Sequence, residues 1–250
     1  MTKISQLTRQ QYLDIQESIP EQVAHCSSLE EAAQKYVSVL YDSLEESVVL
    51  ARLFATLPLS ELGETQQAFV RDLAQSSVGD EPLPPSTNVL TLMGSRGVMP
   101  DWNDRKKSDG HVGIPLVSSE FIEQIPMMSR LLHSLGAGLD WIDSSDSDMV
   151  VRTVGQMTGV FYVADASSEI DQKGRKIIAA QDFVDEHQVK TVFGIGGGYL
   201  GTSLFFTTIL FLRETVDKEI TQRFMLQANK FKTATLDLAI SGKFFSGGPE

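Results

Sequence analysis

The feature that most constrains this chain is an uncharged run, Thr191–Leu212, between Lys190 and Arg213. Its 22 residues would suffice for a helix that spans a bilayer. Five glycines and four threonines lower its helix propensity, and the stretch from Gly196 to Gly201 would interrupt a helix near its middle. The run therefore predicts two buried strands joined by a glycine-rich turn in a water-soluble sheet, without a membrane segment.

Three of these glycines also match a phosphate-binding pattern. Gly196, Gly198 and Gly201 fit Gly-x-Gly-x-x-Gly, which opens the loop of a dinucleotide-binding fold. Only 49 residues follow Gly201, too few for the remaining parallel strands, and the next segment lacks the period of an amphipathic helix. We interpret the glycines as a hairpin turn, where they supply positive φ and allow backbones to approach closely.

Composition limits the class of protein. With 250 residues, 42% hydrophobic and 22% charged, the chain can fold as one large or two small domains, and one is favoured. Its net charge of -12 argues against nucleic acid and anionic membranes as partners. The single cysteine, Cys26, can form neither an internal disulfide nor a multi-thiolate metal site, which suits a reducing compartment. The N-terminus lacks a secretory pattern, so the prediction is a cytoplasmic protein.

Hydrophobic periodicity predicts the other elements. Ser28 and Glu31 form a Ser-x-x-Glu capping box that begins a helix, and the apolar run Ser47–Leu57 predicts a central strand. The Pro-rich stretch at 79–87 fits a loop better than a domain boundary. Further predicted helices are Gln6–Ser18 before Pro20, Gln66–Ala74, one capped by Ser119 that reaches Leu135, and Asp217–Ile240, and further strands are Val89–Met93 and Met157–Ala164.

The order of these elements predicts the fold class. The acidic run at 142–148 is expected to be a loop, and residues 181–187 irregular or briefly helical. Strands and helices do not alternate regularly, as they would in a doubly wound parallel sheet. The chain is therefore expected to be α+β, with an antiparallel sheet and helices on one side.

Two stretches carry a resemblance to a known family: GSRGVMPDWNDRKKSDGHVGIPL (Gly94–Leu116) and FGIGGGYLGTSLFFTTILF (Phe193–Phe211). Together with the order of helix, long strand, loop-rich centre, hairpin and closing helix, they resemble a GAF-like domain. Such domains are small-molecule and chromophore input modules of bacterial histidine kinases and diguanylate cyclases. The resemblance implies a GAF-like central antiparallel sheet flanked by helices over residues 28–240, after an N-terminal helical extension (1–27) and before a flexible tail (241–250).

The resemblance also bears on the ligand. Cyclic-nucleotide-binding members carry a dispersed Asn-Lys, Phe and Asp-Glu signature, whereas Asn229, Lys230 and Phe231 are contiguous here and no Asp-Glu pair follows. Bilin-binding members attach a tetrapyrrole through cysteine, and Cys26 precedes the predicted core near the position used by one branch of phytochromes. A bilin or a haem is therefore the less favoured cofactor. Members that reduce free methionine sulfoxide need an attacking and a resolving thiol, and one cysteine argues against that reaction.

The polar stretch Gly94–Gly113 is expected on the surface and supplies the candidate ligand-binding residues. As a lid over a pocket in the sheet, it would pair a ligand carboxylate or phosphate with an arginine and stack Trp102 on the ligand. A solvated loop whose charges neutralise one another, or a contact with a partner protein, are the alternatives. The candidate residues are Arg96, Trp102, Asn103, Arg105 and His111.

No catalytic motif is present, because neither a Gly-x-Ser-x-Gly elbow nor a His-Glu-x-x-His helix occurs. His25, His133 and His187 are scattered, although Asp185 and Glu186 beside His187 leave a loose metal or proton role open. An enzyme with an unrecognised site remains a third reading.

The leading hypothesis is a regulatory, sensory module that binds a small molecule in a pocket between the sheet and loop 94–113. The terminal helices would pass the signal to a partner protein or through a homodimer. Their apolar residues could fill the core or cover the dimer interface: Tyr36, Leu40, Leu44, Phe224, Phe231 and Leu238. The alternative is a non-catalytic interaction scaffold with a collapsed GAF-like pocket.

Overall fold

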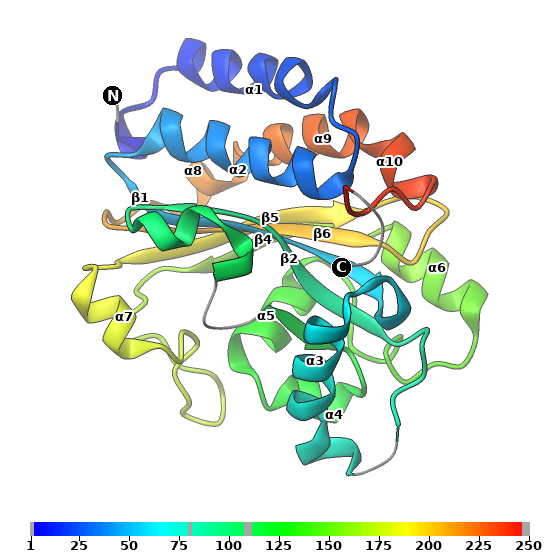
Figure 1. The fold of residues 1–250 in the computed structure, drawn as a ribbon. Coiled ribbons are helices and arrows are strands. Elements are labelled where there is room, and N and C mark those ends of the chain that lie inside the picture. Colours follow the sequence, from blue (N-terminus) through cyan, green and yellow to red (C-terminus); the bar gives the residue numbers. More distant parts are fainter. Residues whose placement is uncertain (1–2, 80–81, 108–111, 247–250) are drawn as a thin grey trace.

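A computed structural model describes residues 3–79, 82–107 and 112–246, in which six antiparallel strands form one sheet (Figure 1). The strand order is β3-β2-β1-β6-β5-β4. The strands are β1 (Val48–Pro58), β2 (Asn88–Gly97), β3 (Gly113–Pro115), β4 (Thr158–Val163), β5 (Thr191–Gly198) and β6 (Phe205–Leu212). The predicted fold class, α+β with a central antiparallel sheet flanked by helices, is confirmed.

The glycine-interrupted run is a β-hairpin, as its residues predict. β5 and β6 pair antiparallel from Thr191 opposite Leu212 to Gly198 opposite Phe205, so the phosphate-loop alternative is excluded. A Cβ on Gly198 would lie 1.7 Å from the carbonyl oxygen of Val154, and Gly201 in the turn has φ +79°. Among the described residues, no helix has the length and apolar character required to cross a membrane.

One helical layer covers the sheet face shown uppermost in Figure 1. It contains α1 (Arg9–Val23), α2 (Leu29–Leu44), α8 (Lys218–Gln222), α9 (Met225–Ala234) and α10 (Leu236–Ile240). Tyr36 of α2 stacks on Phe231 of α9 with 4.6 Å between ring centroids. Five of the six residues named above for core or interface are fully buried within this layer, and Leu238 is partly buried against it, so they fill the core.

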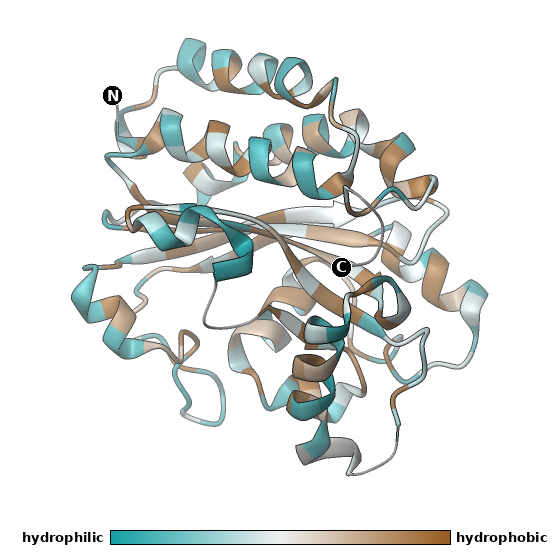
Figure 2. Cartoon of the chain, in the orientation of Figure 1, coloured by the Kyte–Doolittle hydropathy of each residue, from teal (hydrophilic) through white to brown (hydrophobic). Residues whose placement is uncertain are grey.

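A second layer covers the opposite face, which corrects the expectation of helices on one side. It contains α3 (Glu64–Val78), α4 (Ser119–Glu123), α5 (Pro126–Ser134), α6 (Ser147–Gly155) and α7 (Gln181–Glu186). Side chains of alternate direction along each strand reach one layer or the other, and two separate apolar clusters result. Figure 2 shows the strands in white to brown, whereas α1 and α2 mix teal and brown.

Several predicted boundaries were wrong for identifiable reasons. α1 begins later than Gln6 and continues through Pro20 to Val23, because Ile19 and Val23 are buried against the layer below and hold the last turn in place. The helix expected from Ser119 is two helices, α4 capped by Ser118 and α5 beginning at Pro126, which has no N–H to continue a helix.

The closing helix is interrupted at Thr235, between α9 and α10. The Thr235 hydroxyl donates to the Phe231 carbonyl oxygen at 2.8 Å and lies 2.7 Å from the buried Tyr199 Oη. A threonine that bonds its own preceding turn bends a helix. A second break separates α8 from α9, so three helices occupy the range predicted as one.

The irregular stretch was predicted to begin at Gly94, but β2 continues to Gly97, which pairs with Leu50 of the long strand β1. Two 3-10 turns follow, at Pro100–Asn103 (η3) and Arg105–Lys107 (η4), and β3 was not predicted. The acidic run expected to be a loop caps and begins α6, because the Asp146 side chain accepts bonds from the backbone N–H groups of Asp148 and Met149.

Both ends of the described chain contact the first layer. Ile15, Ile19 and Val23 of α1 are buried there. At the start of α2, the Leu29 N–H donates to the Lys243 carbonyl oxygen at 2.8 Å, and the Glu30 N–H donates to the Phe244 carbonyl oxygen at 3.0 Å. These bonds satisfy N–H groups that a helix leaves unpaired at its first turn. The domain boundaries at residues 27 and 241 stay a prediction.

Candidate functional site

A cavity of about 230 Å³ lies between the sheet and the second helical layer. Its floor is formed by Leu50, Arg52, Phe54, Leu90, Ile114, Ile209 and Phe211, from four adjacent strands. Its walls are Trp102, the segment 125–128 at the start of α5, residues 177–180 and Phe183 of α7. This volume is somewhat below the roughly 300–1,000 Å³ of most small-molecule sites, so the cavity suits a small ligand.

Strand alternation explains why successive residues of β1 face two different helical layers. Leu50 and Phe54 pack in the cluster under the sheet, whereas Ala51, Leu53 and Ala55 pack in the cluster around α2. Arg52 therefore points towards the second layer. It is the only ionisable side chain among the described residues that line the cavity, and burial lowers its pKa.

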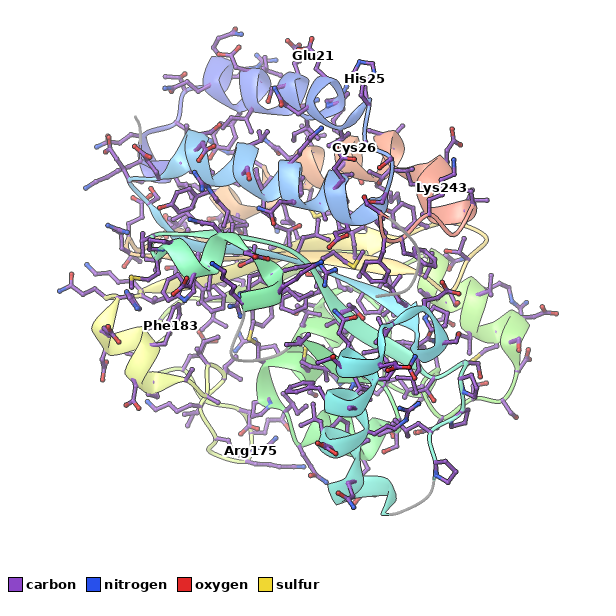
Figure 3. All side chains as sticks on the ribbon, viewed as in Figure 1. Glu21, His25, Cys26, Arg175, Phe183 and Lys243 are labelled. Carbon is purple, nitrogen blue, oxygen red and sulfur yellow. The ribbon has the colours of Figure 1, made fainter. Side chains whose placement is uncertain are left out.

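An aromatic cluster forms one wall. The Trp102 ring lies 5.6 Å from Phe183 and 4.8 Å from His187, and Phe183 lies 5.3 Å from Phe211, all between centroids. Trp102 can take this place because a Cβ on Gly97 would lie 2.8 Å from its Cε3. In Figure 3, Phe183 is labelled on α7, on the cavity side of the sheet. The cluster offers a flat surface on which a ligand ring could stack.

A segment that we call the strap, residues 164–180, ends in the cavity wall at 177–180. Arg175, labelled in Figure 3, ties it to α4: its guanidinium bonds Asp171 at 2.7 Å and the carbonyl oxygens of Glu123 at 2.7 Å and Gln124 at 3.1 Å. Arg130 of α5 and Glu169 of the strap form an ion pair at 2.5 Å. The strap contains no helix or strand, and it is held by these charged hydrogen bonds together with the buried side chains of Ala166, Ile177 and Ile178.

The predicted site residues occupy different places. Trp102 lines the cavity, and the Asn103 Oδ1 accepts a bond from the Gly97 N–H at 2.9 Å, which fixes the loop beneath Trp102. Arg96 pairs with Asp42 at 3.1 Å and lies over the Tyr41 ring, on the side of α2.

Arg105 pairs with Glu30 at the start of α2 and lies over the Phe245 ring. His111 lies outside the described residues. The structure therefore brings Trp102 and Asn103 together and gives Arg96 and Arg105 structural contacts elsewhere, while the ligand-binding role of the five residues stays a prediction.

Sequence reasoning missed Arg52, Ser95 and the wall at 125–128. Arg52 had a signal, since it is the single charge in the apolar strand VVLARLFATLP. Ser95 was assigned to an irregular loop, although it lies in β2 and is 1% exposed. The residues at 125–128 had no polar signature and could be found only through the fold.

A larger hollow of about 450 Å³ lies beside the loop 82–88, Trp141 and Ile142. Its described lining contains no ionisable side chain and includes two prolines, a serine, a threonine and an asparagine of the loop 82–88. It offers a ligand less apolar contact and no charge, so the cavity under Arg52 is the better candidate.

The alternatives of metal and tetrapyrrole find little support in this geometry. No group of three histidine, cysteine, aspartate or glutamate residues that could hold a metal occurs in the described part of the chain. His187 packs in the aromatic wall, with Glu186 4.0 Å away. Cys26 is labelled in Figure 3 beside the helical layer across the sheet from Phe183, so it does not face the cavity.

No protein-family model matches the chain, and no curated protein is similar to it in sequence. Three solved structures are similar over 94% of this chain. The first is a free methionine-R-sulfoxide reductase from Neisseria meningitidis in complex with its substrate, with 9% identity, a TM-score of 0.49 and 95% of that chain covered. The second is the GAF domain of an Acinetobacter phosphoenolpyruvate-protein phosphotransferase, with 12% identity, a TM-score of 0.46 and 99% of that chain covered. The third is the chromophore-binding domain of an unusual bacteriophytochrome from R. palustris, with 9% identity, a TM-score of 0.46 and 64% of that chain covered. At these values the likeness says nothing about ligand, activity or partner.

Proposed function

We propose that this chain is a regulatory module that senses a small, largely apolar molecule in the cavity under β1 and β6. The observation that carries the proposal is the cavity itself, about 230 Å³ with a mainly aliphatic and aromatic lining. A scaffold with a collapsed pocket would have a filled sheet face instead, so the cavity favours sensing over scaffolding. Trp102 is the residue of loop 94–113 that would contact the ligand.

The sheet gives a path from the cavity to the first helical layer. β1 presents Leu50, Arg52 and Phe54 to the cavity and its alternate residues to α2. A ligand that shifts the strand therefore acts on the packing of α2 and α9. In the proposal the output is a partner protein or a second copy, for which the exposed side chains of Leu226, Leu236 and Ile240 on α9 and α10 offer apolar contact.

The test of ligand binding combines native mass spectrometry of freshly purified protein with thermal shifts in a metabolite library. Ala179→Phe places a ring at an exposed rim residue of the cavity and should abolish both a copurified mass and any ligand-induced rise in Tm. Ala24→Phe, an equal change at an exposed residue of the opposite layer, is the matched control. The unchanged protein and Ala24→Phe should both bind a ligand. If neither shows a bound mass or a ligand-induced rise in Tm, the proposal is contradicted.

A further inference from the structure

The strand β4 lies at one edge of the sheet and is bonded on one side only, to β5. In an antiparallel ladder, residues that exchange bonds with the neighbouring strand alternate with residues whose backbone groups point away from it. The Gly198 N–H donates to the Met157 carbonyl oxygen at 2.8 Å, so the odd-numbered residues of β4 bond inwards. The backbone N–H and C=O groups of Thr158, Val160 and Tyr162 therefore point outwards.

Both ends of this outer side are already occupied. The Thr158 N–H donates to the Leu135 carbonyl oxygen at 2.9 Å. Just beyond the strand, the Ala164 N–H donates to the Glu169 carboxylate at 2.7 Å. The two outward residues between these bonds have no hydrogen-bond partner for their backbone groups among the described residues. We call this gap, residues 160–162, the open edge.

β4 lacks the features by which edge strands commonly resist pairing. Within Thr158–Val163 there is no proline and no charged side chain, and the register with β5 contains no bulge. The side chains of Val160 and Tyr162 are partly buried against the first helical layer. The open edge therefore offers a partner backbone N–H and C=O groups, which pair with any extended segment that reaches them.

The segment beside the open edge carries more negative than positive charge. The Tyr162 hydroxyl donates to the Val216 carbonyl oxygen at 2.9 Å, which holds the residues before α8 against the strand. The next three residues are Asp217, Lys218 and Glu219, all exposed. Two carboxylates and one ammonium group thus lie at the entrance of α8.

Tyr162 also responds to this charge. Burial raises the pKa of its phenol, and three nearby carboxylates raise it further, those of Asp217, Glu169 and Glu219. Glu169 is partly neutralised by Arg130, with 2.5 Å between the charged groups. A second copy of this chain would bring the same carboxylates to the edge and a further net charge of -12. Like charges disfavour such a pair, whereas a basic segment is attracted.

We propose that the open edge of β4 docks an extended segment of another protein that carries lysine or arginine beside the paired residues. The backbone of the segment would exchange hydrogen bonds with Val160 and Tyr162, and its basic side chains would lie near Asp217 and Glu219. A segment of about five residues spans the gap between the two occupied ends. The inference goes beyond the proposed function and does not depend on the ligand of the cavity.

The probe is a labelled synthetic peptide of alternating threonine and valine with a lysine at each end. Its affinity for the full chain is measured by fluorescence anisotropy. A copy with every threonine and valine nitrogen methylated keeps the charges but has no N–H groups to pair, and it should bind at least about tenfold more weakly. Asp217→Asn combined with Glu219→Gln should weaken the lysine peptide by about threefold and leave a peptide with glutamine ends unchanged.

Amide hydrogen exchange, followed by NMR, locates the bound peptide. In the free protein the amide hydrogens of Val160 and Tyr162 should exchange faster than those of Phe161 and Val163, which bond β5. The saturating lysine peptide should slow the first pair by at least about tenfold and leave the second pair unchanged.

Val160→Pro removes one outward N–H and keeps the ladder to β5, so it should weaken the lysine peptide severalfold, whereas Val160→Thr is the matched control. The Tm of both variants reports folding, and the methylated peptide tests the pairing on the unchanged protein. Equal affinity for the methylated peptide, no binding of the lysine peptide, or slow exchange at Val160 and Tyr162 in the free monomer would overturn the proposal. A dimer in sedimentation that Val160→Pro dissociates would overturn the choice of partner, because the edge would then pair with a second copy.

Discussion

Tyr36 and Tyr199 are two buried tyrosines whose contributions to folding stability differ, because the hydroxyl of only one of them has a hydrogen-bond partner among the described residues. Both side chains are fully buried, and burial raises the pKa of each phenol. The Tyr199 Oη lies 2.7 Å from the Thr235 hydroxyl, whereas the Tyr36 Oη has no hydrogen-bond partner in the described part of the chain. The two rings bury similar apolar area, so the difference between them is the cost of an unpaired polar group.

Removing each hydroxyl should therefore change stability in opposite directions. Tyr36→Phe is expected to raise the free energy of unfolding by about 1 kcal/mol, because it removes an unpaired buried group. Tyr199→Phe should lower it by about 1 kcal/mol, because a buried hydrogen bond is lost. Urea denaturation of the two variants measures both values. A loss of stability in Tyr36→Phe would show that its hydroxyl has a partner.

At the scale of elements, the hairpin β5–β6 depends on glycine for two different reasons. Gly198 lets the strand approach the end of α6, where a Cβ would overlap the Val154 carbonyl oxygen, while Gly201 adopts positive φ in the turn with open space around it. Gly198→Ala should therefore destabilise the protein by more than about 3 kcal/mol, as overpacking against rigid backbone does. Gly201→Ala should cost only about 1 kcal/mol. Thermal and urea denaturation distinguish the two; equal costs would contradict the close approach.

Local patterns identified those elements whose apolar residues follow a clear period. The hairpin, β1 and α2 were predicted nearly to their ends, because their burial is set by their own residues. The break at Thr235 involves the distant Tyr199, and the extension of β2 depends on its pairing with β1. The break at Pro126 and the start of α6 have local causes, the proline itself and the Asp146 cap, which the period of the apolar residues does not reveal. The lining of the cavity was predicted only in part. Trp102 was among the predicted ligand-binding residues, whereas the position of Arg52 in the lining depends on how the strands and helices pack.

The strap should weaken in acid. Burial alone would raise the pKa of Asp171, but bonds from the backbone and side chain of Arg175 and the backbone of Lys173 hold that pKa below its ordinary value. Side-chain bonds from Ser167 and Ser168 likewise lower the pKa of Asp165. Groups with a lowered folded pKa stabilise the protein above the unfolded pKa, and this contribution is lost as the pH falls through the folded pKa.

We therefore expect the stability of the protein to fall from about pH 4 downwards, with a shallower slope in Asp171→Asn. Urea denaturation across this range measures the slope, with Asp140→Asn, an exposed carboxylate of another loop, as the control. Ligand affinity should fall over the same range, because the strap forms part of the cavity wall. If stability falls with pH equally in the unchanged protein, Asp171→Asn and Asp140→Asn, the strap is not the source of the loss of stability in acid.

At the scale of the molecule, α1 belongs to the packed structure. Ile19 is fully buried, Val23 is 2% exposed, and the N–H of Ile4 donates to the Ser47 Oγ at 2.8 Å at the entry to β1. Ile19→Ala should cost about 2–5 kcal/mol in the free energy of unfolding, the usual range for a core isoleucine. Glu17→Ala, at an exposed position of the same helix, should be nearly neutral.

The prediction for α1 is checked by calorimetric Tm, which also tests whether residues 1–27 can be removed. A truncation before Ser28 that melts like the full chain would show that α1 is an accessory extension. A large loss of Tm would place it within the cooperative unit.

One edge of the sheet, the short strand β3, offers little for a further strand to pair with. The Leu116 N–H donates to the Asn88 carbonyl oxygen and the Val112 carbonyl oxygen accepts from Leu92, so the even-numbered residues of the β3 segment bond inwards to β2. The odd-numbered residues face outwards, and one of them, Pro115, has no N–H to offer. A three-residue border strand that ends in proline gives a neighbouring molecule almost no ladder to extend, which protects this edge of the sheet from edge-to-edge association.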